Sequence, residues 1–309
     1  MRIFVTGSTG FVGTAVVKEL LAAGHQVLGL TRSDKGAKQL KLQGAEPLHG
    51  TIEDLEILQK GASSCDAVIH LAFVHDFTDF PNSCAKDRAA INAMGSTLAE
   101  ADGDRALVIT TGTMLLAGGK MGDEDDTPDL TNPLGVARGA SEGVCLDFAK
   151  RGVRASVVRL PPTTHGPGMS GFMGALIGIA LEKGVSAYVG TGLNHWSAGH
   201  RDDAARVYRL AVEKGEAGSV FHAVGEEGVV MKDIATEVGT RLGIPVVSIA
   251  AEKAEEHFGW FSFGAMADNL ASSKKTQERL GWRPTGLTVI EDVPGIVEFL
   301  KLQRVESKK

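Results

Sequence analysis

Near its start the chain carries Thr6-Gly7-Ser8-Thr9-Gly10-Phe11-Val12-Gly13, which follows a short apolar run and precedes an amphipathic segment at residues 15–21. This order predicts a buried strand, a glycine turn and a helix. Gly7 would allow the sharp turn, Gly10 would let the backbone approach a pyrophosphate, and Gly13 would let helix and strand pack closely. The N–H groups at the start of the helix would bind the anion, so we expect a dinucleotide here.

The composition is that of a globular chain with enough apolar residues for a large core. The length of 309 residues suggests one large domain or two closely packed ones, and 43% of the residues are hydrophobic. The formal net charge of −6 argues against nucleic acid or an anionic membrane as main partner. The three cysteines are far apart and fit reduced thiols, and no spacing predicts a metal site. We expect a cytoplasmic protein, since no signal peptide or membrane-length apolar run is found.

Strand and helix signals alternate through the first half of the chain. Strands are expected at residues 3–5, 26–30, 45–48, 66–71, 105–110 and 154–160, and helices at 35–42, 52–60, 87–101 and 138–150. Repeated units of this kind predict an α/β fold with a doubly wound parallel sheet, covered by helices on both faces. The acidic stretch at residues 123–129 is expected to be a solvated surface turn.

The alternation changes after Pro161-Pro162, where shorter elements and a glycine-rich stretch follow. Helices are expected at 174–181, 232–242 and about 290–300, and short strands at 187–189 and 220–223. We expect residues 1–165 to form a dinucleotide-binding domain and residues 166–309 mainly a smaller, C-terminal substrate lobe. The segment at about 196–225 is expected to return to the first domain.

The end of the second strand bears on the choice of cofactor. Thr31-Arg32-Ser33-Asp34 lies about 20 residues past the glycines, where an acidic side chain would hold the ribose of NAD and an arginine would accept the 2′-phosphate of NADP. Arg32 comes first and Ser33 adds a hydroxyl donor, whereas Asp34 lies further round the turn and could cap the next helix. We therefore expect NADP rather than NAD.

Six stretches, in the right order, resemble motifs of the extended branch of the short-chain dehydrogenase/reductase superfamily, which includes the NAD-dependent epimerases and dehydratases. They are Thr6–Gly13 (TGxxGxxG), His70–Ala72, Asn92–Ser96 (NVxGT), Arg159–Gly168 (LRPxxVYGPG), His200–Ala205 (VHVDDVA) and Leu280–Pro284 (LGWxP). The resemblance implies a Rossmann fold. It also implies cofactor contacts from Gly7, Thr9, Gly10, Phe11, Val12, Gly13, Arg32, Ser33, Thr51, Ile52, Leu71, Ala72, Phe73, Thr111, Arg138, Pro161 and Thr163.

The chain departs from that family at its catalytic pair. The family reads roughly NPYGxSK, with a tyrosine that supplies the proton and a lysine that lowers its pKa and binds the ribose. Here Leu134 takes the tyrosine position and Arg138 the lysine position. No shift of alignment restores the pair, because neither Tyr188 nor Tyr208 has a lysine four residues later. Arg138 could still bind the ribose, but its pKa is too high for proton transfer.

Other residues could complete the chemistry. The family's catalytic hydroxyl falls on Thr113 or, counted from the strand, near Thr111, and either could polarise a carbonyl or only bond turn backbone. A histidine is the natural replacement for the missing proton donor. His165, which lies in the nicotinamide segment by motif position, is our catalytic candidate. His75, which follows the fourth strand, and His195 and His200, which flank Trp196, are the alternatives, and any one of these histidines could also be a packed one. Expected substrate contacts are His75, Met114, Trp196 and His200, and the apolar side chains expected around the substrate include Phe73, Phe77, Phe80, Met169, Phe172 and Met173.

These observations favour an NADP-dependent oxidoreductase that acts on a carbonyl or alcohol of a small, hydrophobic molecule. Two alternatives stay open. One is a redox-neutral isomerase or cyclase on the same scaffold, and the other is a non-catalytic regulatory protein that senses NADP(H). Family habit adds the expectation of a homodimer formed through the two long helices, those at 87–101 and 138–150.

Overall fold

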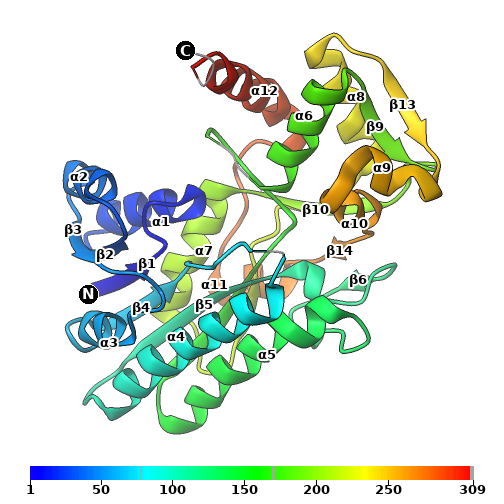
Figure 1. Cartoon of the computed structure of the whole chain (residues 1–309). Coiled ribbons are helices and arrows are strands. Elements are labelled where there is room, and N and C mark those ends of the chain that lie inside the picture. Colours follow the sequence, from blue (N-terminus) through cyan, green and yellow to red (C-terminus); the bar gives the residue numbers. More distant parts are fainter. Residues whose placement is uncertain (77, 169–170, 307–309) are drawn as a thin grey trace.

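The computed structural model describes residues 1–76, 78–168 and 171–306. Its largest element is a seven-stranded, fully parallel sheet in the order β11-β7-β5-β4-β1-β2-β3 (Figure 1). The strands are β1 (Arg2–Thr6), β2 (Gln26–Thr31), β3 (Glu46–His49), β4 (Ala67–His70), β5 (Ala106–Gly112), β7 (Arg154–Leu160) and β11 (Val220–His222). The predicted α/β class and doubly wound parallel sheet are confirmed.

Two helical layers cover this sheet, because successive side chains of a strand point to opposite faces. Ile3 and Val5 of β1 pack with α1 (Phe11–Ala22), α2 (Asp34–Gln43) and α7 (Arg201–Lys214) in one core. Phe4 packs on the other face, with α3 (Leu55–Ser63), α4 (Phe80–Glu100) and α5 (Pro133–Asp147). The strand order reverses between β1 and β4, which is where ligands bind in open sheets of this kind.

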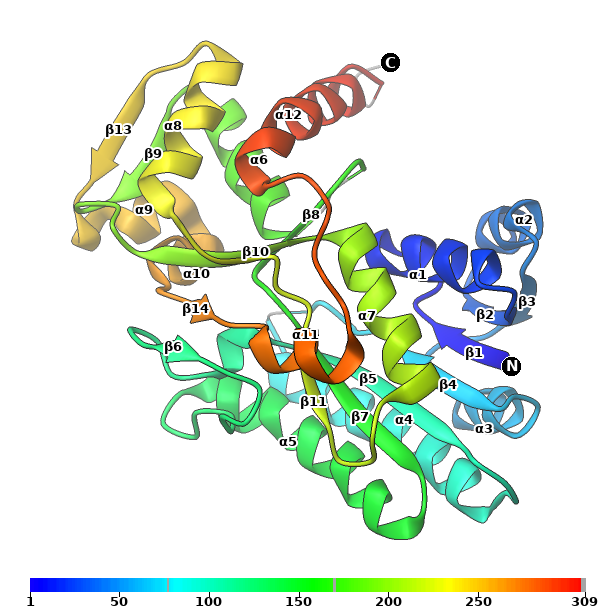
Figure 2. The ribbon, with the colours of Figure 1, turned by 180° about the vertical axis from the view of Figure 1, so that it is seen from behind.

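A smaller lobe lies beyond the carboxyl ends of the central strands (Figures 1 and 2). It contains three small sheets, built from β8 (Thr163–His165), β10 (His195–His200) and β12 (Glu226–Val230), from β9 (Ser186–Val189) and β13 (Val246–Ile249), and from β6 (Met121–Gly122) and β14 (Leu270–Ala271). Its helices are α6 (Phe172–Lys183), α8 (Met231–Leu242), α9 (Ala254–Phe258), α10 (Ser262–Met266) and α12 (Val289–Glu306). Within the segment 196–225, β10 belongs to this lobe, whereas α7 and β11 lie on the central sheet.

The two long helices α4 and α5 begin earlier than the apolar periodicity predicts. α4 starts at Phe80 instead of 87, and α5 starts at Pro133 instead of 138. Both helices carry a proline in the first turn, where its missing N–H costs no hydrogen bond. In α5 the side chain of Asn132 also accepts a hydrogen bond of 2.7 Å from the N–H of Gly135. No described helix is long and apolar enough to cross a bilayer.

The acidic stretch at 123–129 lies at the surface, as its composition predicts, except at Glu124. Glu124 is buried, and its carboxylate accepts hydrogen bonds of 2.6 Å from both the N–H and the hydroxyl of Thr276 in α11 (Lys274–Leu280). Asp125 pairs with Lys275 at 2.7 Å and with Arg279 at 3.0 Å. The expectation was wrong for Glu124 because its partner, Thr276, lies 152 residues further along the chain.

A buried ion pair fixes β7 beneath that loop. The guanidinium of Arg159 donates to both carboxylate oxygens of Glu142, at 2.9 and 2.6 Å, and to the backbone carbonyl of Asp126. His222 lies 3.3 Å from the same guanidinium, and burial together with the charge of Arg159 lowers its pKa to about 4. His222 is therefore neutral at pH 7 and adds no second positive charge to the cluster.

We predict that Glu142→Leu lowers the free energy of unfolding by about 3–5 kcal/mol, because it leaves the Arg159 guanidinium buried without a counter-charge. The double variant Glu142→Leu, Arg159→Leu should recover most of that loss. Urea unfolding of both variants checks the expectation. If the double variant is at least as unstable as the single one, the charge left behind is not the cause.

Candidate cofactor and active site

The glycines of residues 7–13 have the geometry that a dinucleotide requires. Gly7 has a φ of +65°, and a Cβ there would lie 2.8 Å from the backbone nitrogen of Ala72. A Cβ on Gly13 would lie 2.0 Å from the carbonyl oxygen of Gly7, so only glycine allows this close approach. Gly10 is exposed, and the nearest atom to a Cβ there is the Gly7 oxygen at 3.2 Å.

The start of α1 fits an anion by its chemistry. Gly10 is its N-cap, so no side chain there satisfies the free N–H groups, and the first turn holds no acidic residue. Such an end offers unpaired donors and partial positive charge, which suit a pyrophosphate. Thr6 joins this loop to β4, because its hydroxyl accepts a hydrogen bond of 3.2 Å from the N–H of Ala72.

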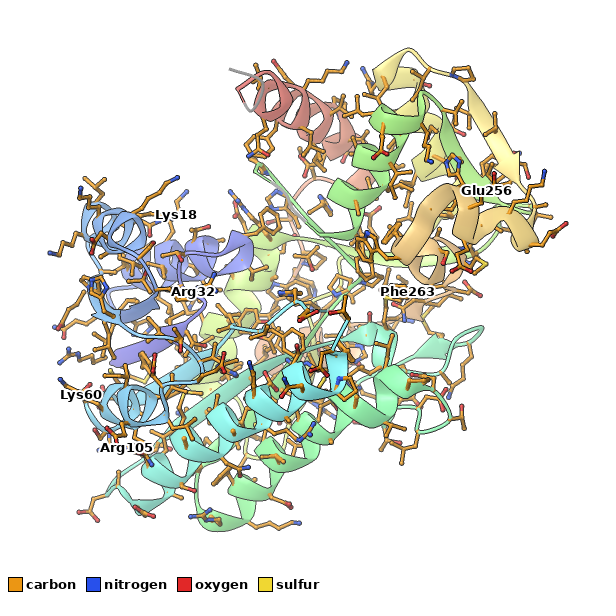
Figure 3. The ribbon with its side chains drawn as sticks, in the orientation of Figure 1. Lys18, Arg32, Lys60, Arg105, Glu256 and Phe263 are labelled. Carbon is orange, nitrogen blue, oxygen red and sulfur yellow. The ribbon has the colours of Figure 1, made fainter. Side chains whose placement is uncertain are left out.

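The end of β2 presents Arg32 at the surface (Figure 3). Its side chain makes no hydrogen bond or ion pair in the part of the chain that the structure describes. The oxygen of Ser33 caps α2 by accepting a hydrogen bond of 3.1 Å from Gly36, and its hydroxyl hydrogen stays available as a donor. Asp34 is not the cap but the first residue of α2, 4.0 Å from His49.

Arg138 lies on α5 and is held from three sides. It pairs with the carboxylate of Asp87, donates to the hydroxyl of Ser141 at 3.2 Å, and donates to the carbonyl oxygen of Thr110 at 2.5 Å. A guanidinium has five N–H donors, so these bonds leave two of them without a partner among the described residues. The three bonds hold the guanidinium plane, so the direction of the two remaining donors is also fixed, and 11% of the side chain is exposed.

A chain of buried side chains connects Arg138 to the glycine loop. Asp87 has no exposed surface and accepts a hydrogen bond of 2.7 Å from Ser141. Its other oxygen lies 3.3 Å from Nε2 of His70, and Nδ1 of His70 lies 2.7 Å from the hydroxyl of Thr6. Burial alone would raise the pKa of Asp87, but the His70 hydrogen bond and the charge of Arg138 outweigh it and lower that pKa.

Aromatic groups lie on the open side of this guanidinium. The Cζ atom of Arg138 is 4.4 Å from the ring centroid of Phe73, and the ring of His75 packs edge-on against Phe73 at 5.3 Å. The His75 side chain reaches the surface, yet the surrounding protein and, secondarily, the charge of Arg138 lower its pKa. Of the histidines proposed from the sequence, His75 is therefore placed beside the arginine.

The two candidate catalytic threonines face inward. Thr113 is fully buried, and its hydroxyl donates to the side-chain oxygen of Asn269 at 2.8 Å. Thr111 donates to Glu142 at 2.6 Å. The resemblance suggested a hydroxyl free to polarise a carbonyl, but in this chain both hydroxyls are used to hold the structure together.

His165 and Trp196 are likewise core residues, with no exposed surface. Nδ1 of His165 lies 2.9 Å from Asp292 of α12, so its ring fastens β8 to the last helix instead of facing a substrate. The indole nitrogen of Trp196 donates to the carbonyl of Gly264. His200, half-buried, caps α7 by accepting a hydrogen bond of 3.2 Å at Nδ1 from Asp202.

The remaining predicted contacts lie at the ends of the expected elements. Leu71, Ala72 and Phe73 follow β4, Thr51 and Ile52 follow β3, Met114 follows β5, and Pro161 and Thr163 flank the start of β8. Thr163 is fully buried and its hydroxyl oxygen has no hydrogen-bond partner among the described residues. Phe77 and Met169 lie outside the described residues. A cavity of about 860 Å³, lined by Glu124, Arg159 and α5, opens at the β11 edge and includes none of these positions.

Asp87, the residue that holds Arg138, was missed as a site residue. It occurs in the helical stripe Cys84, Asp87, Ile91, Met94 and Leu98, where every other side chain is apolar and buried. One carboxylate within an apolar stripe is the signal that could have found it, because a buried charge requires a partner. Among the described residues, no group of three or more His, Cys, Asp or Glu could hold a metal ion.

The chain resembles known proteins in sequence and in fold. Residues 3–224 match the profile described as the NAD dependent epimerase/dehydratase family. The chain is 48% identical over 300 residues to an uncharacterized protein of Schizosaccharomyces pombe, covering 97% of this chain and 100% of that protein, and 43% identical to one of Saccharomyces cerevisiae, covering 95% and 98%. Its fold matches dTDP-glucose 4,6-dehydratase from Streptomyces venezuelae, solved with NAD bound, with a TM-score of 0.80, 18% identity and coverage of 99% and 98%.

We predict that Asp87→Asn lowers the free energy of unfolding by about 3–5 kcal/mol at neutral pH, because Arg138 loses its buried counter-charge. The pKa of Asp87 is lower in the folded chain than in the unfolded one. The stabilisation is therefore complete above the unfolded value, near 4, and is lost as pH falls through the lower folded value. The gap between wild type and variant should narrow on acidification.

Urea unfolding at neutral and acidic pH measures this gap. Asp147→Asn is the matched control, because that carboxylate is 70% exposed in its pair with Lys150 and should matter little. A gap that stays constant from neutral pH down to about 2.5 would contradict the role given to the Asp87 carboxylate.

Proposed function

The chain belongs to the NAD dependent epimerase/dehydratase family, and we propose that it is an NADP-dependent oxidoreductase acting on a carbonyl or alcohol group of a small, apolar molecule. The observation that carries this proposal is the buried anchoring of Arg138 at the position where the family has its lysine. A side chain that only needed to be solvated would not require a carboxylate, a hydroxyl and a backbone carbonyl to hold it.

Arg138 can bind the ribose, which is one of the two roles of the family's lysine. Its two remaining N–H donors would bond the hydroxyls of the nicotinamide ribose, and its positive charge would favour an oxygen on which negative charge develops. It cannot give up a proton, since its pKa stays above about 12. A bound nicotinamide would supply or accept the hydride.

We assign proton transfer to His75. Its ring lies next to Phe73, which in turn lies under the Arg138 guanidinium, so it is on the same side of the sheet as the proposed ribose contact. Because its pKa is lowered, His75 is mostly neutral at pH 7. It would therefore act as a base for alcohol oxidation near pH 7 and as an acid for carbonyl reduction at lower pH.

Half-buried aromatic side chains support an apolar substrate. The ring centroids of Phe73 and Phe80, in the first domain, are 5.9 Å apart. Those of Phe172 and Phe263, in the second lobe, are 5.8 Å apart. Figure 3 shows Phe263 extending from α10 toward the space between the two halves. Such rings bind apolar or aromatic groups through dispersion and edge-on packing.

A second function, a regulatory protein that binds NADP(H) without turnover, is favoured by one observation. The hydroxyls of Thr111 and Thr113 are both committed to buried partners, so the family's carbonyl-polarising hydroxyl has no counterpart there. This alternative and the first one require the same cofactor site. They differ in whether ketones are reduced.

We expect Arg32→Ala to weaken NADPH binding about 10–100-fold, because a charged hydrogen bond to the 2′-phosphate contributes about 1.5–3 kcal/mol. NADH has no 2′-phosphate, and its affinity should change less than about threefold. Isothermal titration calorimetry with both coenzymes measures the two losses. Lys35→Ala, on the exposed first turn of α2, is the control for loss of surface charge. Equal losses for the two coenzymes would remove the assignment of NADP.

NADPH consumption with a panel of aromatic and aliphatic ketones, such as acetophenone and 2-octanone, tests the reaction. Turnover should rise as pH falls from about 8 to 6, because His75 becomes protonated as its lowered pKa is approached. His75→Gln should flatten this profile, and Arg138→Met should lower turnover about 100-fold at every pH. Tight NADPH binding by the wild type without any turnover would instead support the regulatory alternative.

A further inference from the structure

We propose that Arg201 is a positively charged ligand of the cofactor pyrophosphate, completing from the second half of the chain the anion site that the glycine loop begins. This inference rests on the proposed function only in requiring that a dinucleotide binds at the glycine loop. It is independent of which reaction follows, and of the choice between NADP and NAD.

Arg201 lies where the two halves of the molecule meet. It is the first residue of α7, directly after β10, and its Cζ atom is 5.0 Å from the ring centroid of Phe11. Phe11 is the first residue of α1 and directly follows Gly10. Figures 1 and 2 both show the starts of α1 and α7 beside one another. The Arg201 guanidinium therefore lies against the ring of the first residue of α1, the helix whose start would hold the phosphates.

The position of this guanidinium is fixed by the loop after β8. A Cβ on Gly166 would lie 3.1 Å from Cγ of Arg201, so the glycine makes room for the arginine stem. The NH1 group of Arg201 donates a hydrogen bond of 2.5 Å to the carbonyl of Pro167. With stem and one nitrogen fixed, the rest of the fork keeps a defined direction, which reduces the entropy lost when it binds a ligand.

The guanidinium keeps unused hydrogen-bonding capacity. Its Nε atom is buried and forms an ion pair of 3.4 Å with the half-exposed carboxylate of Asp202, but it makes no hydrogen bond among the described residues. The NH1 group bonds Pro167, and the NH2 group has no hydrogen-bond partner among the described residues, so the fork can still donate to a ligand oxygen. The neighbouring end of α1 also lacks an acid or a side-chain cap. A phosphate oxygen would satisfy both groups at once.

Two sources could provide such an oxygen, the pyrophosphate of the coenzyme or a diphosphate on a substrate. We assign the coenzyme, because Arg201 stacks on a residue of the glycine motif itself. ADP-ribose carries the first diphosphate and UDP the second, so they serve as separate probes.

The test compares Arg201→Met, which removes the charge and keeps an apolar stem, with Arg201→Lys, which keeps the charge without the fork. Lys18→Met is the matched control, since Lys18 is exposed on the same α1 helix and carries the same charge. Isothermal titration calorimetry would be run with ADP-ribose, NADPH, NADH and UDP, and thermal unfolding would verify that each variant is folded.

In Arg201→Met we expect the dissociation constants of ADP-ribose, NADPH and NADH to rise together about 10–100-fold, and their dependence on salt to weaken. Arg201→Lys should lie between Arg201→Met and wild type, and Lys18→Met should stay within about twofold. A folded Arg201→Met that binds ADP-ribose as tightly as wild type overturns the proposal, as does a loss confined to UDP. Failure of the wild type to bind any of the dinucleotides would refute the proposed function itself.

Discussion

The carboxylate of Asp87 is fully buried, and the side chains around it are arranged to stabilise its charge. An isolated buried carboxylate is too costly to remain charged, so it requires a cation and hydrogen-bond donors around it. Arg138, Ser141 and His70 provide them from α5 and β4. A lysine ammonium has three N–H donors, so the same three bonds would leave none for a ligand, whereas the guanidinium keeps two. Arg138 on α5 and Asp87 on α4 therefore form one structural unit.

Buried polar side chains connect the two halves of the chain. Thr113 and Asn269 bond each other twice, through the threonine hydroxyl and through its backbone carbonyl, and Ser197 joins the same cluster. His165 and Asp292 form another buried link, between β8 and α12 within the second lobe. The cluster of Thr113, Asn269 and Ser197 fastens the second lobe to the first. Buried hydrogen-bond networks of this kind help to specify one arrangement of the packed parts.

The sequence predicted what depends on local pattern. The glycine motif, the alternation of strands and helices and the parallel sheet followed from spacing and apolar periodicity, which act within about 20 residues. What it could not provide were pairings between distant side chains. Thr113 carries the same residue type whether it faces a carbonyl or Asn269, 156 positions away. Glu124 was taken for a surface residue because the backbone that binds it belongs to α11. Asp87 alone offered a usable signal, as a charge inside an apolar stripe.

The central sheet is completed only by residues from late in the chain. Its edge strand β11 ends at His222, whose N–H is bonded by Thr276, and the buried Trp282 packs in the same core as β1 and α1. When only the first 165 residues have been synthesised, the sheet therefore lacks its edge strand β11, and the core lacks the Trp282 side chain. A domain of continuous sequence can complete its core as soon as it has been synthesised. The core around β1 and α1 is completed only when Trp282 joins it.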